Sequence, residues 1–178
     1  MQVFKTFLLA LAVVPALGAA PKASNANIDN ALNKMQQMGE NMDNVKRNLE
    51  NYQGGTLRAL PVANAIHTAH KSAEDARMTF GNSDPFNDSE GLRILDAYND
   101  MHPRLIAALQ DGTKKAPLFK EAGVGYMARS VISNLYTEKS SFQDQMKTVL
   151  SPDHYQMLEP RLHEIDNVFK TTLASYAN

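Results

Sequence analysis

The residues with the clearest potential for chemistry are two histidines three positions apart, His67 and His70. Imidazoles at this spacing lie on one face of a helix and can share a metal ion. Glu74 and Asp75 could complete such a site only on a crowded helix face, and no other ligand follows nearby. Both histidines also lie beside the apolar stripe of their segment. We therefore interpret them as exposed and predict no metal site.

Other catalytic signatures are equally weak. His102, His154 and His163 stand singly, each beside a position that we expect to face inward. The chain has no cysteine and no Gly-x-Ser-x-Gly nucleophile motif. The glycine pair Gly54-Gly55 lacks the preceding strand and the Gly-Lys-Ser/Thr ending of a phosphate-binding loop. The sequence therefore predicts a protein that is not an enzyme and that holds no cofactor.

Composition narrows the classes of partner. The 178 residues suit one domain, and the absence of cysteine excludes a disulfide framework. With 18 basic and 19 acidic residues, the formal net charge is −1, and tryptophan is absent. Because neither sign dominates, we expect neither nucleic acid nor an anionic membrane surface as a partner.

The first 20 residues have the pattern of a secretory signal peptide. Lys5 supplies the positive charge, Phe7 to Val14 are mostly apolar, and small residues follow up to Ala20. Cleavage is expected after Gly18 or Ala20, and a retained anchor is the alternative. The run is too short for a membrane-spanning helix, and the C-terminus lacks the long apolar tail of a GPI signal. We predict a secreted protein whose single domain occupies residues 21–178.

Apolar residues at spacings of three and four positions predict five amphipathic helices. Two stripes run over residues 28–52 and 62–80, and a third helix begins near Ser89, with Leu92 inward and a kink at Pro103. A turn at 111–115 and a short corner element around Pro117 and Gly123 should separate it from a fourth helix, 124–149. The fifth begins at Pro152 and should bend at Pro160. No strand pattern appears, so the sequence predicts an all-α, antiparallel bundle.

Two polar features interrupt this pattern. Asn87-Asp88-Ser89 is an N-glycosylation sequon in the polar break that separates the second and third helices, which makes Asn87 a candidate glycosylation site. Glu138 falls on the apolar stripe of the fourth helix. It could reach water from the edge of the stripe or make a polar contact inside a cavity.

Several short motifs give the chain a family resemblance. They are Tyr52-Gln53-Gly54-Gly55, Leu60-Pro61-Val62-Ala63, and the stretch Lys115-Ala116-Pro117-Leu118-Phe119-Lys120-Glu121-Ala122-Gly123-Val124 with Ser130 to Leu135 after it. With these motifs the chain resembles the fungal hydrophobic surface-binding protein A and cell-wall galactomannoprotein family over residues 28–176. The resemblance implies a five-helix bundle, and a secreted or wall-associated protein that adheres to hydrophobic surfaces or holds fatty acids between its helices.

Methionine is frequent on the apolar stripes, and its flexible side chain suits surfaces that adapt to variable apolar partners. An ordinary filled core explains the same stripes. With the resemblance, we favour a secreted, non-enzymatic protein that binds a fatty acid or another lipid in an apolar cavity. One alternative is a protein that adsorbs to hydrophobic surfaces and recruits hydrolases. Another is a structural mannoprotein bound to cell-wall glycan. The candidate lining residues, chosen from the stripes, are Met35, Met42, Ile66, Leu95, Phe119, Met127, Val131, Phe142, Ile165 and Phe169.

Overall fold

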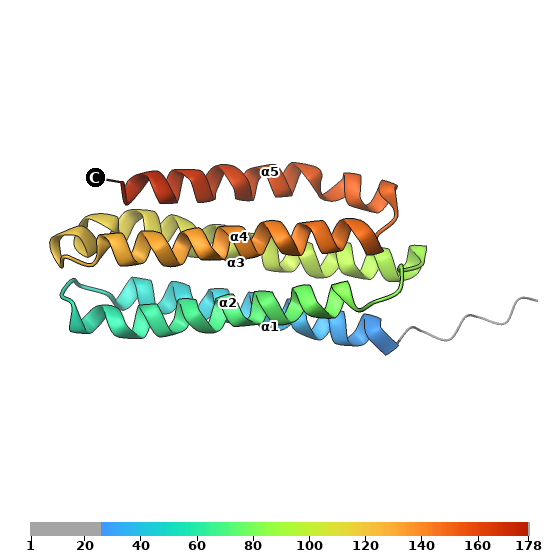
Figure 1. Cartoon of the computed structure of the whole chain (residues 1–178), viewed down its shortest axis with the longest axis horizontal. Helices are drawn as coiled ribbons and strands as arrows, with labels where there is room; N and C mark the ends of the chain where they lie inside the picture. The colour runs from blue at the N-terminus through green and yellow to red at the C-terminus, as the bar shows by residue number, and fades with distance from the viewer. Residues whose placement is uncertain (1–25, 178) are drawn as a thin grey trace, which may run out of the picture.

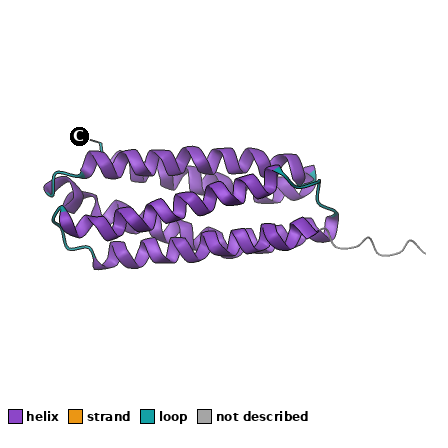
Figure 2. Cartoon of the chain, turned by 60° about the horizontal axis from the view of Figure 1, so that its bottom comes forward, coloured by secondary structure: helices purple, strands orange, loops and turns teal. Residues whose placement is uncertain are grey.

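The computed structural model describes residues 26–177, which form an elongated bundle of helices (Figure 1). The elements are α1 (Ala26–Asn51), the short 3₁₀ helix η1 (Leu57–Ala59), α2 (Leu60–Gly81), α3 (Asp88–Glu121), α4 (Gly125–Val149) and α5 (Pro152–Ser175). No strand occurs in this part of the chain, and short loops join the helices at the two ends of the bundle (Figure 2). The predicted all-α, antiparallel bundle of five helices is confirmed. The predicted leader, residues 1–20, lies outside the described residues.

The apolar stripes pack into one continuous core. On α1, Met35, Met42 and Leu49 are buried, as their spacing predicts. This helix contacts α2 and α3 along its length, while α2 also packs on α4 and α3 on α5. By comparison, α4 makes sparse contacts with α3 and α5. Among the described helices, none is long and apolar enough to cross a membrane.

Helix α3 differs from the prediction, because it continues through residues 111–115 and through Pro117. The predicted turn and the separate corner element are therefore wrong. Gly112 is buried where α3 packs on α5, and a methyl group placed on it would make only an ordinary contact, 3.8 Å from the side chain of Thr172. Its carbonyl accepts a hydrogen bond from the Tyr176 hydroxyl at 2.8 Å. Pro117 is exposed. Burial of Phe119 stabilises the last turns of α3 and outweighs the helix-breaking tendency of Gly112 and Pro117.

The corner falls at residues 122–124. Gly123 adopts a φ of 73°, and the Val124 N–H donates to the carbonyl of Phe119 at 3.0 Å. The Gly123 N–H donates to the carbonyl of Lys120 at 2.9 Å, which completes a Schellman motif. The left-handed glycine thus turns the chain from α3 into α4.

Two neighbouring residues fix the polar break between α2 and α3 at the end that leads into α3. Phe86 is buried, its ring lies edge-on to Phe80 with centroids 5.9 Å apart, and its N–H donates to the carbonyl of Val149 at 2.8 Å. Asn87 caps α3: its side chain accepts from the Glu90 N–H, and the Glu90 carboxylate accepts from the Asn87 N–H. This capping box fixes where the helix begins.

The inward prediction for Leu92 is wrong, since this side chain is 51% exposed. The preceding residue, Gly91, is buried, and a Cβ placed on it would lie 2.3 Å from Nδ1 of His154. Because α3 turns Gly91 toward α5 here, Leu92 points to solvent and the stripe continues with Ile94 and Leu95.

Candidate functional site

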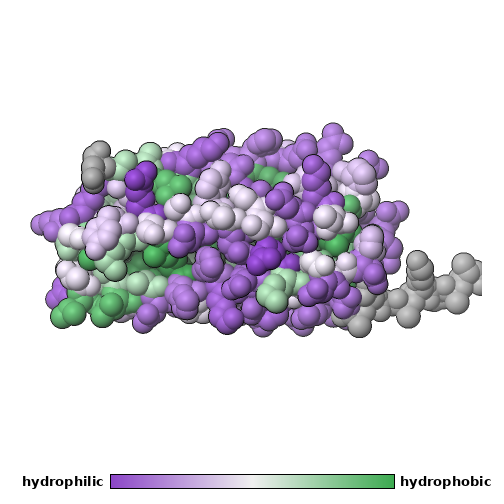
Figure 3. Space-filling model, in the orientation of Figure 1, coloured by the Kyte–Doolittle hydropathy of each residue, from purple (hydrophilic) through white to green (hydrophobic). Residues whose placement is uncertain are grey.

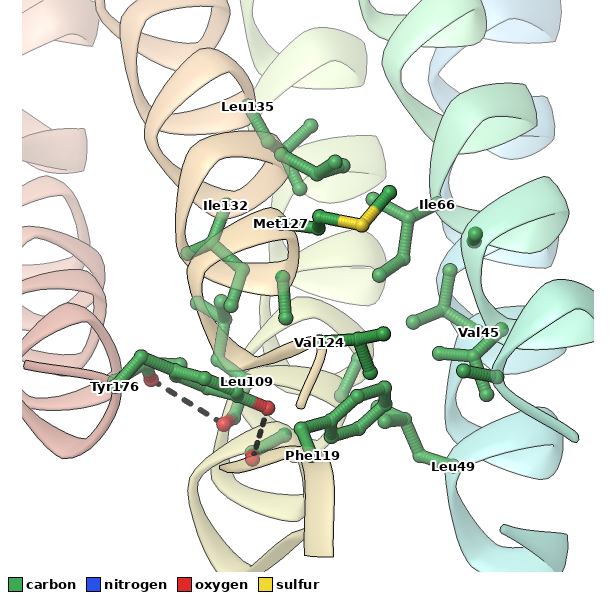
Figure 4. A pocket seen from close by; sticks show the side chains of 18 of the residues that line it. Val45, Leu49, Ile66, Leu109, Phe119, Val124, Met127, Ile132, Leu135 and Tyr176 are labelled. Atoms are coloured by element: carbon green, nitrogen blue, oxygen red, sulfur yellow. Dashed lines mark hydrogen bonds between the residues drawn. The ribbon is translucent and has the colours of Figure 1, made fainter. Parts of the chain in front are cut away.

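An apolar pocket of about 180 Å³ lies near the end of the bundle that carries the α1–α2 and α3–α4 connections (Figure 4). All five helices and the α1–α2 connection contribute to its wall. The lining residues are Met42, Val45, Leu49, Thr56, Ala59, Leu60, Val62, Ala63, Ile66, Leu105, Ala108, Leu109, Gly112, Phe119, Val124, Met127, Ala128, Val131, Ile132, Leu135, Thr172 and Tyr176. We call this end of the bundle the mouth end.

Several small side chains line this level of the bundle. Ala59, Ala63, Ala108, Gly112 and Ala128 all belong to the wall. Where residues this small face one another, the helix backbones must come closer together or leave space between them. The sparse contacts of α4 with α3 and α5 leave that space open.

Aromatic rings lie on one side of this space. The ring of Phe119 stacks on that of Tyr52, with centroids 4.3 Å apart and planes inclined by 26°. Tyr176 lies 6.0 Å from Phe119, centroid to centroid. These three residues come from the ends of α3, α1 and α5, so they tie the three helix ends together.

The polar atoms of the lining side chains already have partners. The Tyr176 hydroxyl donates to the carbonyl of Gly112 at 2.8 Å, and the Thr172 hydroxyl donates to the carbonyl of Val168 at 2.8 Å. Thr56 Oγ1 donates to the carbonyl of Ala122 at 3.1 Å. Burial raises the pKa of Tyr176, so its hydroxyl stays protonated. No charged side chain lines the pocket among the residues described. The wall is therefore chemically a hydrocarbon surface.

The pocket opens to solvent where the first turns of α2 and α4 face each other. Leu60 and Met127 line it and are also 57% and 53% exposed. Val131, one turn further along α4, is half-buried. Met127 was expected to face inward and instead lies at the opening, where it contributes to both the wall and the surface.

Five of the ten candidate lining residues belong to this pocket: Met42, Ile66, Phe119, Met127 and Val131. The structure places the other five elsewhere. Met35 borders a more polar hollow between α1 and α3, and Leu95 is buried in the core. Phe142, Ile165 and Phe169 surround a void of about 30 Å³ at the centre of the bundle.

The reason lies in side-chain size. The apolar stripes run the whole length of the bundle, but at its centre they carry large rings. The ring of Phe142 is edge-on to Phe80, with centroids 5.0 Å apart, and Phe169 lies 5.1 Å from Tyr136. These rings fill the centre, where Ala73 is also buried, whereas a hollow remains beside Ala108, Gly112 and Ala128 at the mouth end. Periodicity alone does not show which small residues face a ring and which face a hollow.

Charged groups near the core are paired outside the pocket. Glu138 accepts a hydrogen bond from Arg77 Nε at 2.6 Å and so joins α4 to α2, with its side chain 12% exposed. Lys139 is paired with Asp166 of α5, and burial lowers the pKa of Lys139 against the opposing effect of that carboxylate. Within residues 26–177, no group of three or more potential metal ligands gathers. His67 is exposed as expected, whereas His70 is half-buried, so the interpretation of His70 as exposed is wrong.

Comparisons with solved structures show which known folds this bundle resembles. The crystal structure of Afmp4p in complex with palmitic acid superposes with a TM-score of 0.81 at 14% identity, covering 84% of this chain and 99% of that one. Ligand binding domain 2 of the MP1 protein of Penicillium marneffei, complexed with multiple arachidonic acids, gives 0.79 at 16% identity, with 84% and 96% covered. Domain 1 of that protein, complexed with arachidonic acids, gives 0.78 at 10% identity, with 85% and 98% covered. At these identities the likeness establishes the fold.

The family itself follows from the sequence comparison. No curated protein matches the chain. The family model described as hydrophobic surface binding protein A matches residues 28–148, which is more than half of the chain and includes α1 to α4 almost completely. The resemblance drawn from the short motifs is thereby confirmed: the chain belongs to the hydrophobic surface binding protein A family.

Proposed function

We propose that this protein binds the hydrocarbon chain of a fatty acid or a related lipid in the mouth-end pocket and catalyses no reaction on it. The observation that carries the proposal is a pocket wall made of carbon, in which every side-chain hydroxyl already has a hydrogen-bond partner. Such a wall has no group to offer a polar ligand. The fatty acids named in the structures of the same fold support this class of ligand.

The size of the pocket indicates how much of a ligand it holds. A dry engineered cavity of ~150 Å³ accepts benzene, so about 180 Å³ has room for only the end of a long acyl chain. Each methylene buried contributes roughly 0.8 kcal/mol. A longer stretch of the acyl chain fits only if side chains of the wall move. Met42 and Met127 line the pocket, and their flexible side chains can change conformation to accommodate it.

The same wall determines the orientation of the ligand. A carboxylate moved into this pocket would lose its hydration and find neither a free donor nor a cation, which costs several kcal/mol. The methyl end therefore enters first, and the carboxylate stays at the opening near Leu60 and Met127. This orientation needs no catalytic or charged group inside the bundle.

We also propose that the protein is secreted and carries a glycan on Asn87, as a cell-wall or extracellular glycoprotein would. The leader pattern of residues 1–20 and the sequon support this proposal. Asn87 is exposed, and its cap uses the side-chain oxygen and the backbone N–H, so the amide nitrogen that a glycan modifies takes no part in the capping box.

Val131→Asp tests the pocket. The substitution places a carboxylate in the wall at a half-buried position, so we expect at least about a tenfold loss of affinity for a fluorescent fatty acid while the bundle stays folded. Ser133→Asp, on an exposed position of the same helix, is the matched control and should bind like the unmodified protein. Equal affinity of the Val131→Asp protein would refute the proposed site.

Phe142→Ala tests whether this residue belongs to the filled core or to the ligand-binding pocket. Because Phe142 is 3% exposed and packs on Phe80, its truncation should cost about 3–5 kcal/mol of unfolding free energy, as in other filled cores. The affinity for the fatty-acid probe should not change. Denaturant melts and probe displacement measure the two effects. A large loss of affinity with little loss of stability would move the ligand to the centre of the bundle.

A fatty alcohol should bind within about tenfold of the fatty acid of the same length, since the hydrocarbon wall contacts both chains equally and both polar head groups stay in water at the opening. Competition of both ligands against one probe measures the ratio. Much weaker binding of the alcohol would mean that a charged anchor, and not the hydrocarbon wall, dominates the affinity.

Ser89→Ala tests glycosylation without disturbing the helix cap. The change destroys the sequon but leaves Asn87 and its capping box intact. Protein recovered from the medium of a glycosylating host should lose the mass of one glycan and keep its melting temperature. Masses of the parent and the variant that differ only by the oxygen atom removed in Ser89→Ala would show that Asn87 is unmodified.

A further inference from the structure

The opening of the pocket is bordered by apolar side chains that point into solvent. Leu57 is 81% and Tyr126 is 73% exposed, and Leu60 and Met127 are more than half exposed. We call these four residues the apolar rim. They come from two segments far apart in the sequence, which the hydrogen bond from Thr56 to the Ala122 carbonyl joins at 3.1 Å. Figure 3 shows apolar surface gathered at this end of the bundle.

The charge of the molecule is divided along its long axis. The mouth end, taken as residues 44–63, 107–131 and 168–177, holds eight basic and three acidic residues. The rest of the described chain holds eight basic and sixteen acidic residues. A net charge near zero therefore conceals a positive end and a negative body, and the pocket opens at the positive end.

Two arginines lie close in sequence to residues of the apolar rim. Arg58 follows Leu57 in η1, and Arg129 lies one helical turn after Tyr126 on α4. Both are exposed, and neither forms an ion pair within the described residues. Exposed apolar and aromatic side chains with arginines beside them match the boundary between acyl chains and anionic headgroups.

We propose that the mouth end docks on a lipid surface that carries anionic headgroups. The apolar rim enters the acyl boundary, and Arg58 and Arg129 contact the headgroups. Charge favours this occupant over a second copy of the chain, because two copies meeting at their rims would bring two positive ends together. The proposal departs from the expectation, drawn from the balanced composition, that an anionic membrane surface is a poor partner.

Docking also gives an acyl chain a route from the lipid into the pocket. This step rests on the proposed function, the binding of a fatty acid or related lipid. With the rim in the lipid, an acyl chain passes methyl end first from the lipid surface into the pocket without crossing water. Docking itself requires only the rim and the arginines, so the two ideas can fail separately.

Flotation with vesicles tests the docking. The purified protein should bind vesicles of phosphatidylcholine and phosphatidylserine, bind phosphatidylcholine alone more weakly, and lose affinity in high salt. The double change Leu57→Ser/Tyr126→Ser should weaken binding by about tenfold or more. Neither residue lines the pocket, so displacement of a soluble fatty-acid probe should be unchanged. The matched control is Leu92→Ser/Met157→Ser, two apolar residues exposed at the opposite end.

A second variant tests the contribution of the two arginines to vesicle binding. Arg58→Gln/Arg129→Gln should reduce binding to the anionic vesicles on the order of fivefold for each arginine, and Lys71→Gln/Lys147→Gln, outside the mouth end, should not. Failure of the protein to bind anionic vesicles, or equal effects of the control variants, would overturn the docking. Self-association of the protein that is lost in the rim variants would also overturn the docking on lipid, because it would identify a second copy of the chain as the partner of the rim. Vesicle binding by a protein that binds no soluble fatty acid would instead refute the proposed function and leave the docking in place.

Discussion

The stack of Phe119 on Tyr52, with Tyr176 beside it, is the interaction on which the pocket depends. It joins the ends of three helices at a level where the neighbouring positions are alanine and glycine. Rings of this size fix the spacing of the helix ends, and the small side chains cannot fill what lies between them. The result is an apolar space that the surrounding helices enclose, except where α2 and α4 begin.

An unfilled pocket has an energetic cost, which connects the fold to the function. Wall atoms that face an open apolar pocket lack the packing partners that a filled core would give them, which lowers stability. The rest of the bundle offsets this through a well-filled centre and through pairs such as Arg77–Glu138 that join helices. A hydrocarbon ligand that occupies the space recovers part of the lost contacts, so binding and folding stability rise together.

The sequence predicted the helices well because each of them buries one stripe, and stripes are visible in periodicity. It failed at residues 111–115, where lysines and a glycine suggested a turn, because Gly112 is buried against α5 and its carbonyl accepts from Tyr176, which are long-range contacts that no local pattern reveals. The sequence also did not distinguish residues that line the pocket from residues that fill the core. Val131 and Phe142 lie on one stripe, and only the residues opposite them decide that one borders a hollow and the other a filled centre. Overall charge likewise concealed the positive end, since its basic residues are distributed over four helices and the α1–α2 connection.

The location of the acyl chain is the central claim, and a bound ligand tests it most directly. A fatty acid that carries bromine on its terminal carbon can be placed in a crystal structure of the complex by the anomalous signal of the bromine. The account predicts bromine inside the mouth-end pocket, which Ile66 and Val131 line, with the carboxylate at the opening near Leu60. Bromine at the centre of the bundle beside Phe142, or outside the protein with the carboxylate buried, would contradict it.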